Sequence, residues 1–403
     1  MHAALRNFRN VTVGYSKIFV RNMHENPLGF MIASCPPTDW RNPEVIRIYN
    51  QILSYYLFLQ MLNEFKVKNM FGMKKSLVQL IGCLSFLTLL GSCTEHCEDV
   101  IDTSGIDMEV DLVRLETQYK GVKSPEDAQD FLARNEKFTK YNLDAGKPEE
   151  LLLQEVQRLG IVPIDTLLLD VSKQYGDFQR EKEELTGLFK NIKTFYPDFT
   201  APEINTMVSG FGGYILDDGG DVLLIGLDYF LDSTATYLPP KNEIPNYIKR
   251  HLTKEKIVVK TAFALSNRFF EMETGAELIN HMIKYGKQYY FAHRMLPCKE
   301  EFEILDYTPE EWEIIKKHEY STYAYFTKNE LFYNTKQEKY RLFLGESPKC
   351  TAVGDDCPGR IGRWLGYEII KSYVENNDVS LQELMAEQNH VKIFTQSGYK
   401  PGK

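Results

Sequence analysis

The chain has 403 residues, a formal net charge of −9 at pH 7 and a pI near 5.6. An acidic chain without a lysine or arginine cluster lacks the basic surface that phosphate backbones need, so we expect no nucleic acid as a partner. Aromatic residues make up 13% of the chain, far more than disordered proteins carry, which indicates a globular domain with a substantial core.

Residues 1–72 show no completed pattern of secondary structure. The signal described next works only at an N-terminus, so a start at Met73 is the economical interpretation. We therefore predict that residues 1–72 are a spurious upstream extension and not a domain. The alternative is a genuine extension in which residues 52–65 form an amphipathic helix.

The stretch Met73–Cys93 has the parts of a bacterial lipoprotein signal. Two lysines follow the methionine, an apolar run of 14 residues comes next, and the stretch ends in Leu-Gly-Ser-Cys. The run is too short to span a bilayer comfortably, and a basic start with a small-residue finish is what a signal peptidase recognises. We predict a signal peptide over residues 73–92 and lipidation of Cys93, the first residue of the mature protein. The alternative is a buried helix that ends in cysteine.

A short acidic segment, Thr94–Asp99, follows the predicted lipidation site. Such polar segments normally stay flexible and separate a domain from the bilayer. We predict a flexible acidic tether over residues 93–109 and a single globular domain over residues 110–403. An ordinary solvated linker is one interpretation of the acidic residues. They also resemble, loosely, the surface-export signals of Bacteroidota lipoproteins.

The domain is expected to begin with a strand and several helices. Alternation over residues 111–116 predicts a half-buried strand. Ser124 followed by Pro125 and two acidic residues predicts a helix start, with the serine as the N-cap. Further helical patterns cover residues 149–159, 164–174 and 177–195.

The apolar period then changes to that of strands. Short runs over residues 204–208 and 222–225 enclose turn residues, and Asp218-Gly219 predicts a tight hairpin. We therefore expect a small antiparallel sheet. The carboxylates of residues 217–221 could bind calcium instead, but they lack the alternating ligands and terminal glutamate of an EF-hand, which favours the hairpin.

Helical patterns dominate after Asp228, so the predicted fold class is α+β and predominantly helical. The expected helices cover residues 254–271, 276–295, 308–326, 362–376, 380–386 and 390–395.

No familiar catalytic motif is present. A zinc peptidase of the His-Glu-x-x-His type needs two imidazoles one turn apart, and His281 has Tyr285 at that position. The His318-Glu319 pair has Thr322 in place of the second imidazole. A Gly-x-Ser-x-Gly elbow and a Walker loop are also absent. We therefore predict no catalytic residue, no metal and no cofactor.

The stretch 357–367 is the densest one without an assigned role. Its glycines allow close approach to another backbone, and its other side chains could line a concave site for an acidic or planar group. The predicted binding residues are Arg360, Arg363, Trp364 and Tyr367. The alternative, which glycine spacing favours, is a tightly packed helix entry with exposed arginines.

Two cysteines, Cys350 and Cys357, bracket a loop that contains Gly354. Outside the cytoplasm this pair is the best candidate for a disulfide. Two unpaired thiols are the alternative, because connectivity cannot be read from a sequence.

An ordered set of segments resembles the gliding-motility lipoprotein family of Bacteroidota, GldB. The resemblance covers Met73–Lys403. Its segments are the lipobox ending at Cys93, Ile225–Leu231, Met282–Phe291, Tyr307–Trp312, Pro358–Gly366 and Ser397–Pro401.

The family is distantly similar to zincin-type metallopeptidases, which implies a zincin-like helical core. In that comparison residues 254–271 take the place of the metal-binding helix, and residues 284–291 match the helix that supplies a third ligand. The first segment has no histidine and the second has no acidic residue.

What the resemblance implies is an accessory, non-catalytic binding role at the cell envelope, associated with gliding motility and linked protein secretion. We expect a lipid anchor at Cys93, carrying palmitate or a similar acyl chain, that holds the protein to the outer membrane. An envelope protein is the expected partner. The alternative is an envelope metal-dependent hydrolase, similar to a peptidase, with a non-standard site.

Overall fold

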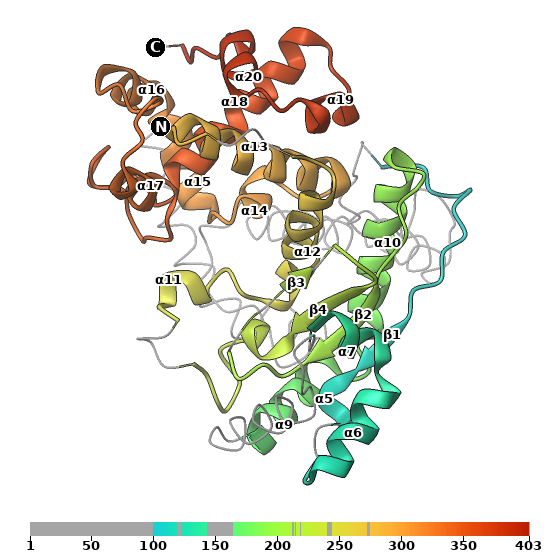
Figure 1. Cartoon of the computed structure of the whole chain (residues 1–403). Coiled ribbons are helices and arrows are strands. Elements are labelled where there is room, and N and C mark those ends of the chain that lie inside the picture. The colour runs from blue at the N-terminus through green and yellow to red at the C-terminus, as the bar shows by residue number, and fades with distance from the viewer. Residues whose placement is uncertain are drawn as a thin grey trace, which may run out of the picture. The chain divides into compact units, whose positions relative to one another are not determined.

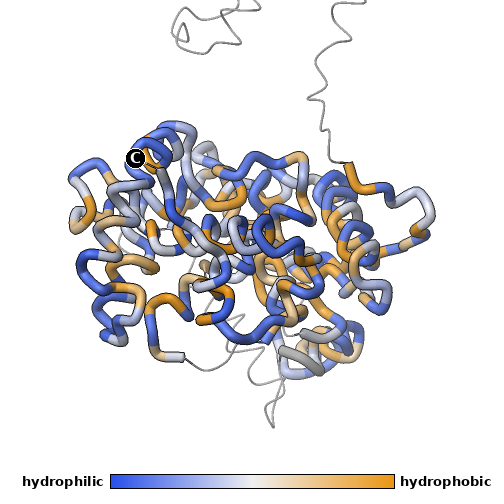
Figure 2. Tube along the Cα trace, turned by 90° about the horizontal axis from the view of Figure 1, so that it is seen from above, coloured by the Kyte–Doolittle hydropathy of each residue, from blue (hydrophilic) through white to orange (hydrophobic). Residues whose placement is uncertain are grey.

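The computed structural model describes residues 100–402, apart from 119–121, 143–163, 212, 214, 218, 240–243 and 272–274. The predicted signal peptide, Cys93, residues 1–72 and the predicted helix over residues 149–159 lie outside the described residues. Within the described part, no helix combines the length and the apolar character needed to cross a bilayer. In Figure 2 hydrophilic and hydrophobic residues accordingly alternate along the helices.

The first part of the domain mixes short strands with helices (Figure 1). In chain order these elements are β1 (Leu112–Arg114), α5 (Leu115–Gln118), α6 (Pro125–Arg134), α7 (Glu136–Asn142), α9 (Ile164–Tyr175), α10 (Gln179–Phe195), β2 (Glu203–Met207), β3 (Ile215–Asp217), β4 (Val222–Gly226) and the 3-10 helix η4 (Leu227–Phe230).

The second part is helical throughout its described residues. Its elements are α11 (Asn246–Lys249), η5 (Lys254–Lys256), α12 (Ile257–Leu265), η6 (Ser266–Arg268), α13 (Leu278–Met295), α14 (Glu301–Ile304), α15 (Pro309–Lys317), α16 (Glu319–Lys328), α17 (Gln337–Leu344), α18 (Ile361–Asn377), α19 (Leu381–Ala386) and α20 (His390–Ser397). The predicted α+β, mainly helical class is confirmed.

The sheet has four strands in the order β1-β2-β4-β3. β1 pairs with β2, and β2 with β4, in parallel, while only β3 and β4 are antiparallel. The prediction of an antiparallel sheet is therefore wrong except for that hairpin. The reason is that the strand expected at residues 111–116 returns to β2 after a long helical connection, which is how parallel neighbours are joined.

The β3–β4 hairpin is confirmed where the structure describes it. Gly219 has a φ of +80°, the left-handed conformation that hairpin turns require. The Asp217 carboxylate accepts a hydrogen bond from Arg268 Nε at 2.8 Å. This carboxylate, one of the candidate calcium ligands, is therefore already paired with a guanidinium.

Both faces of the sheet are covered, which explains the uninterrupted apolar sequence of β4. All five residues of β4 are buried. Val222 and Leu224 pack in a small core with residues of α6 and α7. Leu223 and Ile225 point to the opposite face and join the main core with residues of α10 and α12. A strand covered on both sides needs apolar residues at every position.

The chain reaches β1 on the side of α10 (Figure 1), and residues 108–110 line a groove with that helix. Val110 is 3% exposed, and Met108 packs against the main core. The predicted flexible tether therefore does not extend as far as residue 109, because apolar side chains fix its last residues to the domain.

Capping residues and apolar periodicity in the sequence predicted several helices correctly. The Ser124 hydroxyl accepts a hydrogen bond from the Asp127 backbone N–H at 3.2 Å and caps α6. The predicted helices corresponding to α9, α10, α13 and α18 are confirmed. The single helix expected over residues 254–271 is instead η5, α12 and η6, and the one over residues 308–326 is divided at His318 into α15 and α16.

Candidate functional site

Arg360, the first predicted binding residue, lies inside the domain. Only 5% of it is exposed, and its Nη1 donates to the Leu305 carbonyl at 3.5 Å. Its Nη2 donates to the Asp306 carbonyl, and the guanidinium lies 4.9 Å from the ring centre of Tyr307. The guanidinium therefore donates to backbone carbonyls and packs on an aromatic ring inside the domain.

Arg363 ties α18 to the end of α17. Its Nε donates to the Leu344 carbonyl at 2.6 Å, at the helix C-terminus, where a cation is favoured. Its Nη1 lies 2.9 Å from Glu346 Oε1, and the guanidinium stacks on Tyr285 at 4.5 Å. Glu346 also pairs with Arg360 Nε at 3.5 Å. One carboxylate thus joins both arginines.

Trp364 and Tyr367 have no exposed surface. The Tyr367 hydroxyl lies 2.7 Å from His293 Nδ1 and 3.1 Å from Glu301 Oε1. Among the described residues, Trp364 Nε1 has no hydrogen-bond partner. Both rings are part of the core between α18 and its neighbours.

The prediction of an open binding site at these four residues is therefore wrong. A Cβ added to Gly359 would lie 1.9 Å from the Ser347 carbonyl oxygen, and one added to Gly366 would lie 2.0 Å from that of Met282. Glycine lets α18 approach so closely that the side chains beside it are enclosed. The packing alternative holds, except that both arginines are paired instead of exposed, with Arg360 buried and Arg363 half-buried.

Asp306 is the centre of a charged cluster that the sequence analysis missed. Its carboxylate is ion-paired with Lys260, lies 3.7 Å from Lys256 Nζ and lies 3.8 Å from Arg360 Nη1. Burial raises the pKa of this carboxyl, but the three cations outweigh burial and hold it below its usual value. The available signal was the spacing of Lys256 and Lys260, four residues apart.

His251 lies close to this cluster, and 7% of it is exposed. Its Nε2 accepts a hydrogen bond from Arg250 Nε at 3.0 Å. Burial lowers the pKa of His251 to about 3, and the neighbouring Arg360 adds to the effect. The imidazole is therefore neutral at physiological pH.

His281 and His318, the two histidines considered above as zinc ligands, contact other residues than those of the Asp306 cluster. His281 packs on Tyr340 with ring centres 4.6 Å apart, and His318 Nε2 lies 3.4 Å from Asp356 Oδ2. Across the described residues, no three His, Cys, Asp or Glu side chains are grouped so that they could hold a metal ion.

The cysteines differ from the predicted pairing. Cys350 and Cys357 are buried free thiols, so the predicted disulfide between them is not formed in the structure. The Cys350 N–H donates to the Cys357 carbonyl at 2.8 Å, which closes this loop without a covalent bond. Cys298, in contrast, is disulfide-bonded.

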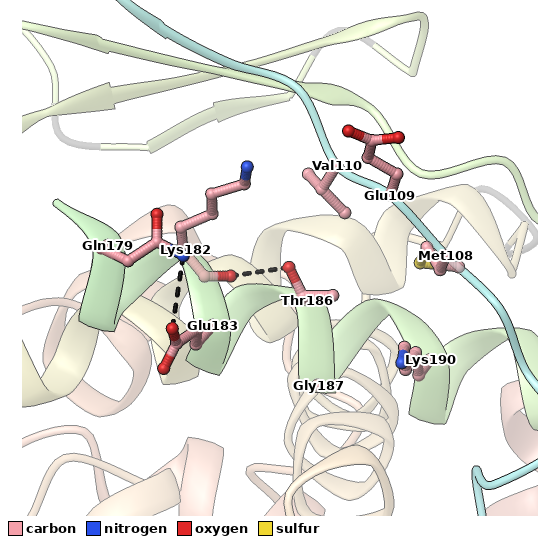
Figure 3. A pocket seen from close by; sticks show the side chains of 9 residues that line it. All are labelled: Met108, Glu109, Val110, Gln179, Lys182, Glu183, Thr186, Gly187 and Lys190. Atoms are coloured by element: carbon pink, nitrogen blue, oxygen red, sulfur yellow. Dashed lines mark hydrogen bonds between the residues drawn. The ribbon is translucent and has the colours of Figure 1, made fainter.

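Two surface grooves accompany the N-terminal part of the domain. One, of about 410 Å³, lies between residues 108–110 and α10 and is shown in Figure 3. The other, of about 630 Å³, lies between the β1–α5 segment and α9. Its buried Glu116 is paired with Arg114 and accepts a hydrogen bond from Thr206 Oγ1 at 2.8 Å.

The comparisons with known proteins give one result. Residues 96–401, which are 306 of the 403, match the family described as Gliding motility protein GldB. No curated protein and no solved structure gives a match. The distant likeness to zincins therefore stays a prediction. The family predicted from the ordered segments is confirmed, and the chain belongs to the GldB family of gliding motility proteins.

Proposed function

We propose that this protein is a lipid-anchored accessory component of the cell envelope that serves gliding motility through binding and not through catalysis. Membership of the GldB family supports the association with gliding motility and with the cell envelope. The Met73–Cys93 stretch supports the lipid anchor. We take the partner to be an envelope protein, the membrane to be the outer membrane, and protein secretion to be the linked process.

The ion-paired cluster at Asp306 carries the non-catalytic part of the proposal. The segment compared with the metal helix of zincins presents Lys256 and Lys260 to this carboxylate. A zinc site uses neutral imidazoles and thiolates or carboxylates with available lone pairs. An ammonium group has no lone pair and repels a divalent cation. The arrangement favours a structural cluster over a hydrolytic centre.

Cys93→Ala tests the anchor. Radiolabelled palmitate should label the wild-type protein and not this variant, because the variant lacks the acylated thiol. Cys83→Ala is the matched control, since it removes a cysteine of the signal peptide ahead of the lipidation site. Its labelling should equal that of the wild type. Palmitate in the Cys93→Ala protein would contradict the assignment.

Metal analysis tests the alternative, a peptidase-like hydrolase. The purified protein is expected to hold no stoichiometric zinc. Zinc bound one to one, and lost on replacing His281 or His318, would overturn the non-catalytic proposal.

A further inference from the structure

The groove between residues 108–110 and α10 is lined by a regular row of side chains. Lys182, Thr186 and Lys190 follow one another at intervals of four residues, so they share one face of the helix. Figure 3 shows Lys182 extending from α10 toward residues 108–110, and Lys190 at the end of the groove near Met108. The groove therefore has an ammonium group toward each end.

The acidic side chains nearby do not neutralise this row. Among the described residues, neither Lys182 nor Lys190 has a carboxylate within ion-pair distance, although both lysines are half-buried. Glu183 is exposed and accepts a hydrogen bond from Gln179 Nε2 at 3.3 Å. Glu109 and Glu183 both line the groove as well. In Figure 3 the Glu109 carboxylate is exposed and points away from α10. The groove thus offers two cations to an external anion.

The length of chain before the domain restricts what can face this groove. Val100 is the seventh residue after Cys93, and an extended chain of seven residues reaches at most about 25 Å. Residues 108–110 then line the groove beside α10, and Val100 is 69% exposed. A lipid anchor at Cys93 would hold this face of the domain close to the bilayer surface.

We propose that the Lys182–Lys190 groove binds an anionic phospholipid headgroup and so seats the domain on the membrane with α10 toward the bilayer. This inference rests on the proposed anchor at Cys93. Each ammonium carries three donors for phosphate oxygens, and a volume of about 410 Å³ is within the range of ligand sites. A lysine close to an anionic bilayer strengthens binding about fivefold, so the two together contribute about 25-fold.

Amide hydrogen exchange of the lipidated protein in vesicles tests the proposal. Exchange in residues 102–112 should be slower in vesicles of phosphatidylcholine with phosphatidylglycerol than in phosphatidylcholine alone. Substituting both Lys182→Gln and Lys190→Gln should weaken docking about 25-fold and abolish the difference. High salt should abolish it for the wild type as well, since it screens the charges.

The matched control substitutes Lys328→Gln and Lys336→Gln. These exposed lysines belong to the α16–α17 region, across the molecule from α10 in Figure 1. The control changes the net charge equally and should keep the wild-type protection. Equal thermal unfolding midpoints of all three proteins would verify that each is folded.

Protection that survives the Lys182 and Lys190 substitutions, or that is equal in both vesicle types, would overturn the groove assignment. Failure of the anchor has a different signature, because the wild type would then not sediment with phosphatidylcholine vesicles. In that case sedimentation with phosphatidylglycerol vesicles should still fall when the two lysines are replaced. No fall would overturn the groove independently of the anchor.

Discussion

Asp306 shows how this domain keeps a carboxylate ionised in its interior. The residue is 3% exposed, and three cations from η5, α12 and the start of α18 surround it. Breaking a buried ion pair leaves an uncompensated charge, which is costlier than the loss of an exposed pair. Burial, together with Arg360 and Lys260 of this cluster, also lowers the pKa of His251.

His251 should make the protein less stable in mild acid. Its unfolded pKa is near 6.5 and its folded pKa is about 3, so between these values only the unfolded state binds the proton. The free energy of unfolding should therefore fall as the pH drops below 6.5, with a loss of about 2 kcal/mol by pH 5. Urea denaturation at pH 7 and pH 5 measures this loss, and His251→Gln should remove it.

The half-buried carboxyl of Glu368 affects stability in the opposite direction. Burial raises the pKa of Glu368 to about 7, so its contribution to stability is present at low pH and is lost as the pH rises from about 4.5 to 7. The contribution of His251 is therefore the difference in the free energy of unfolding between the wild type and His251→Gln, measured at each pH. A difference that does not change between pH 7 and pH 5 would show that His251 is protonated normally in the folded state.

The sequence identified residues 357–367 as unusual and left two roles open, of which the packing role favoured by the glycine spacing is the one that the structure shows. Glycine beside arginine and tryptophan suits both a binding site and a tight packing site, and what decides between them is the surrounding chain. The carbonyls of Leu305 and Asp306 reach Arg360 from more than 50 residues away. That proximity has no local sequence signal.

Two glycines let the helices α13 and α18 cross with their backbones close together. A Cβ on Gly286 would lie 2.4 Å from the Gly366 carbonyl oxygen, and one on Gly366 would lie 2.0 Å from that of Met282. Both obstacles are backbone atoms, which cannot rotate aside as a flexible side chain can. A methyl group at either glycine therefore fits only if the two helices move apart.

Gly366→Ala should lower the free energy of unfolding by about 3 kcal/mol, because overpacking forces the helix backbones apart. The control is Gly187→Ala in α10, where an added Cβ meets nothing within 4 Å. It should raise the stability by about 0.8 kcal/mol, through helix propensity alone. Urea denaturation of both variants measures the two effects, and a Gly366→Ala protein as stable as the wild type would refute the close crossing.

Elements with local start signals were predictable, whereas their pairing was not. Thr308 and Ser380 each cap a helix in a capping box with a glutamate three residues later. The parallel pairing of β1 with β2 depends on how the intervening helices pack, and strand alternation carries no information about that. This is why the sheet was expected to be antiparallel.

At the scale of the whole molecule, we expect the mature protein to begin at Cys93, leaving 311 residues (403 − 92). Mass spectrometry of protein extracted from native membranes should find an acylated Cys93 and no peptide from residues 1–92. A gene that starts at Met73 should yield the same mature protein. A peptide from residues 1–72 in the native protein would contradict both the start and the cleavage site.

The parallel pairing of β1 with β2 also has a consequence for the order of folding. Leu112 pairs with Ile204, 92 residues later in the chain. Contacts between residues so far apart lose much chain entropy before they stabilise anything, which slows folding. A chain that emerges N-terminus first presents β1 long before its partner, so that strand has to stay unpaired until α10 and β2 have followed. The sheet can therefore begin to close only once β2 has been made, while the helices α12 to α20 that follow it in the chain are still to come.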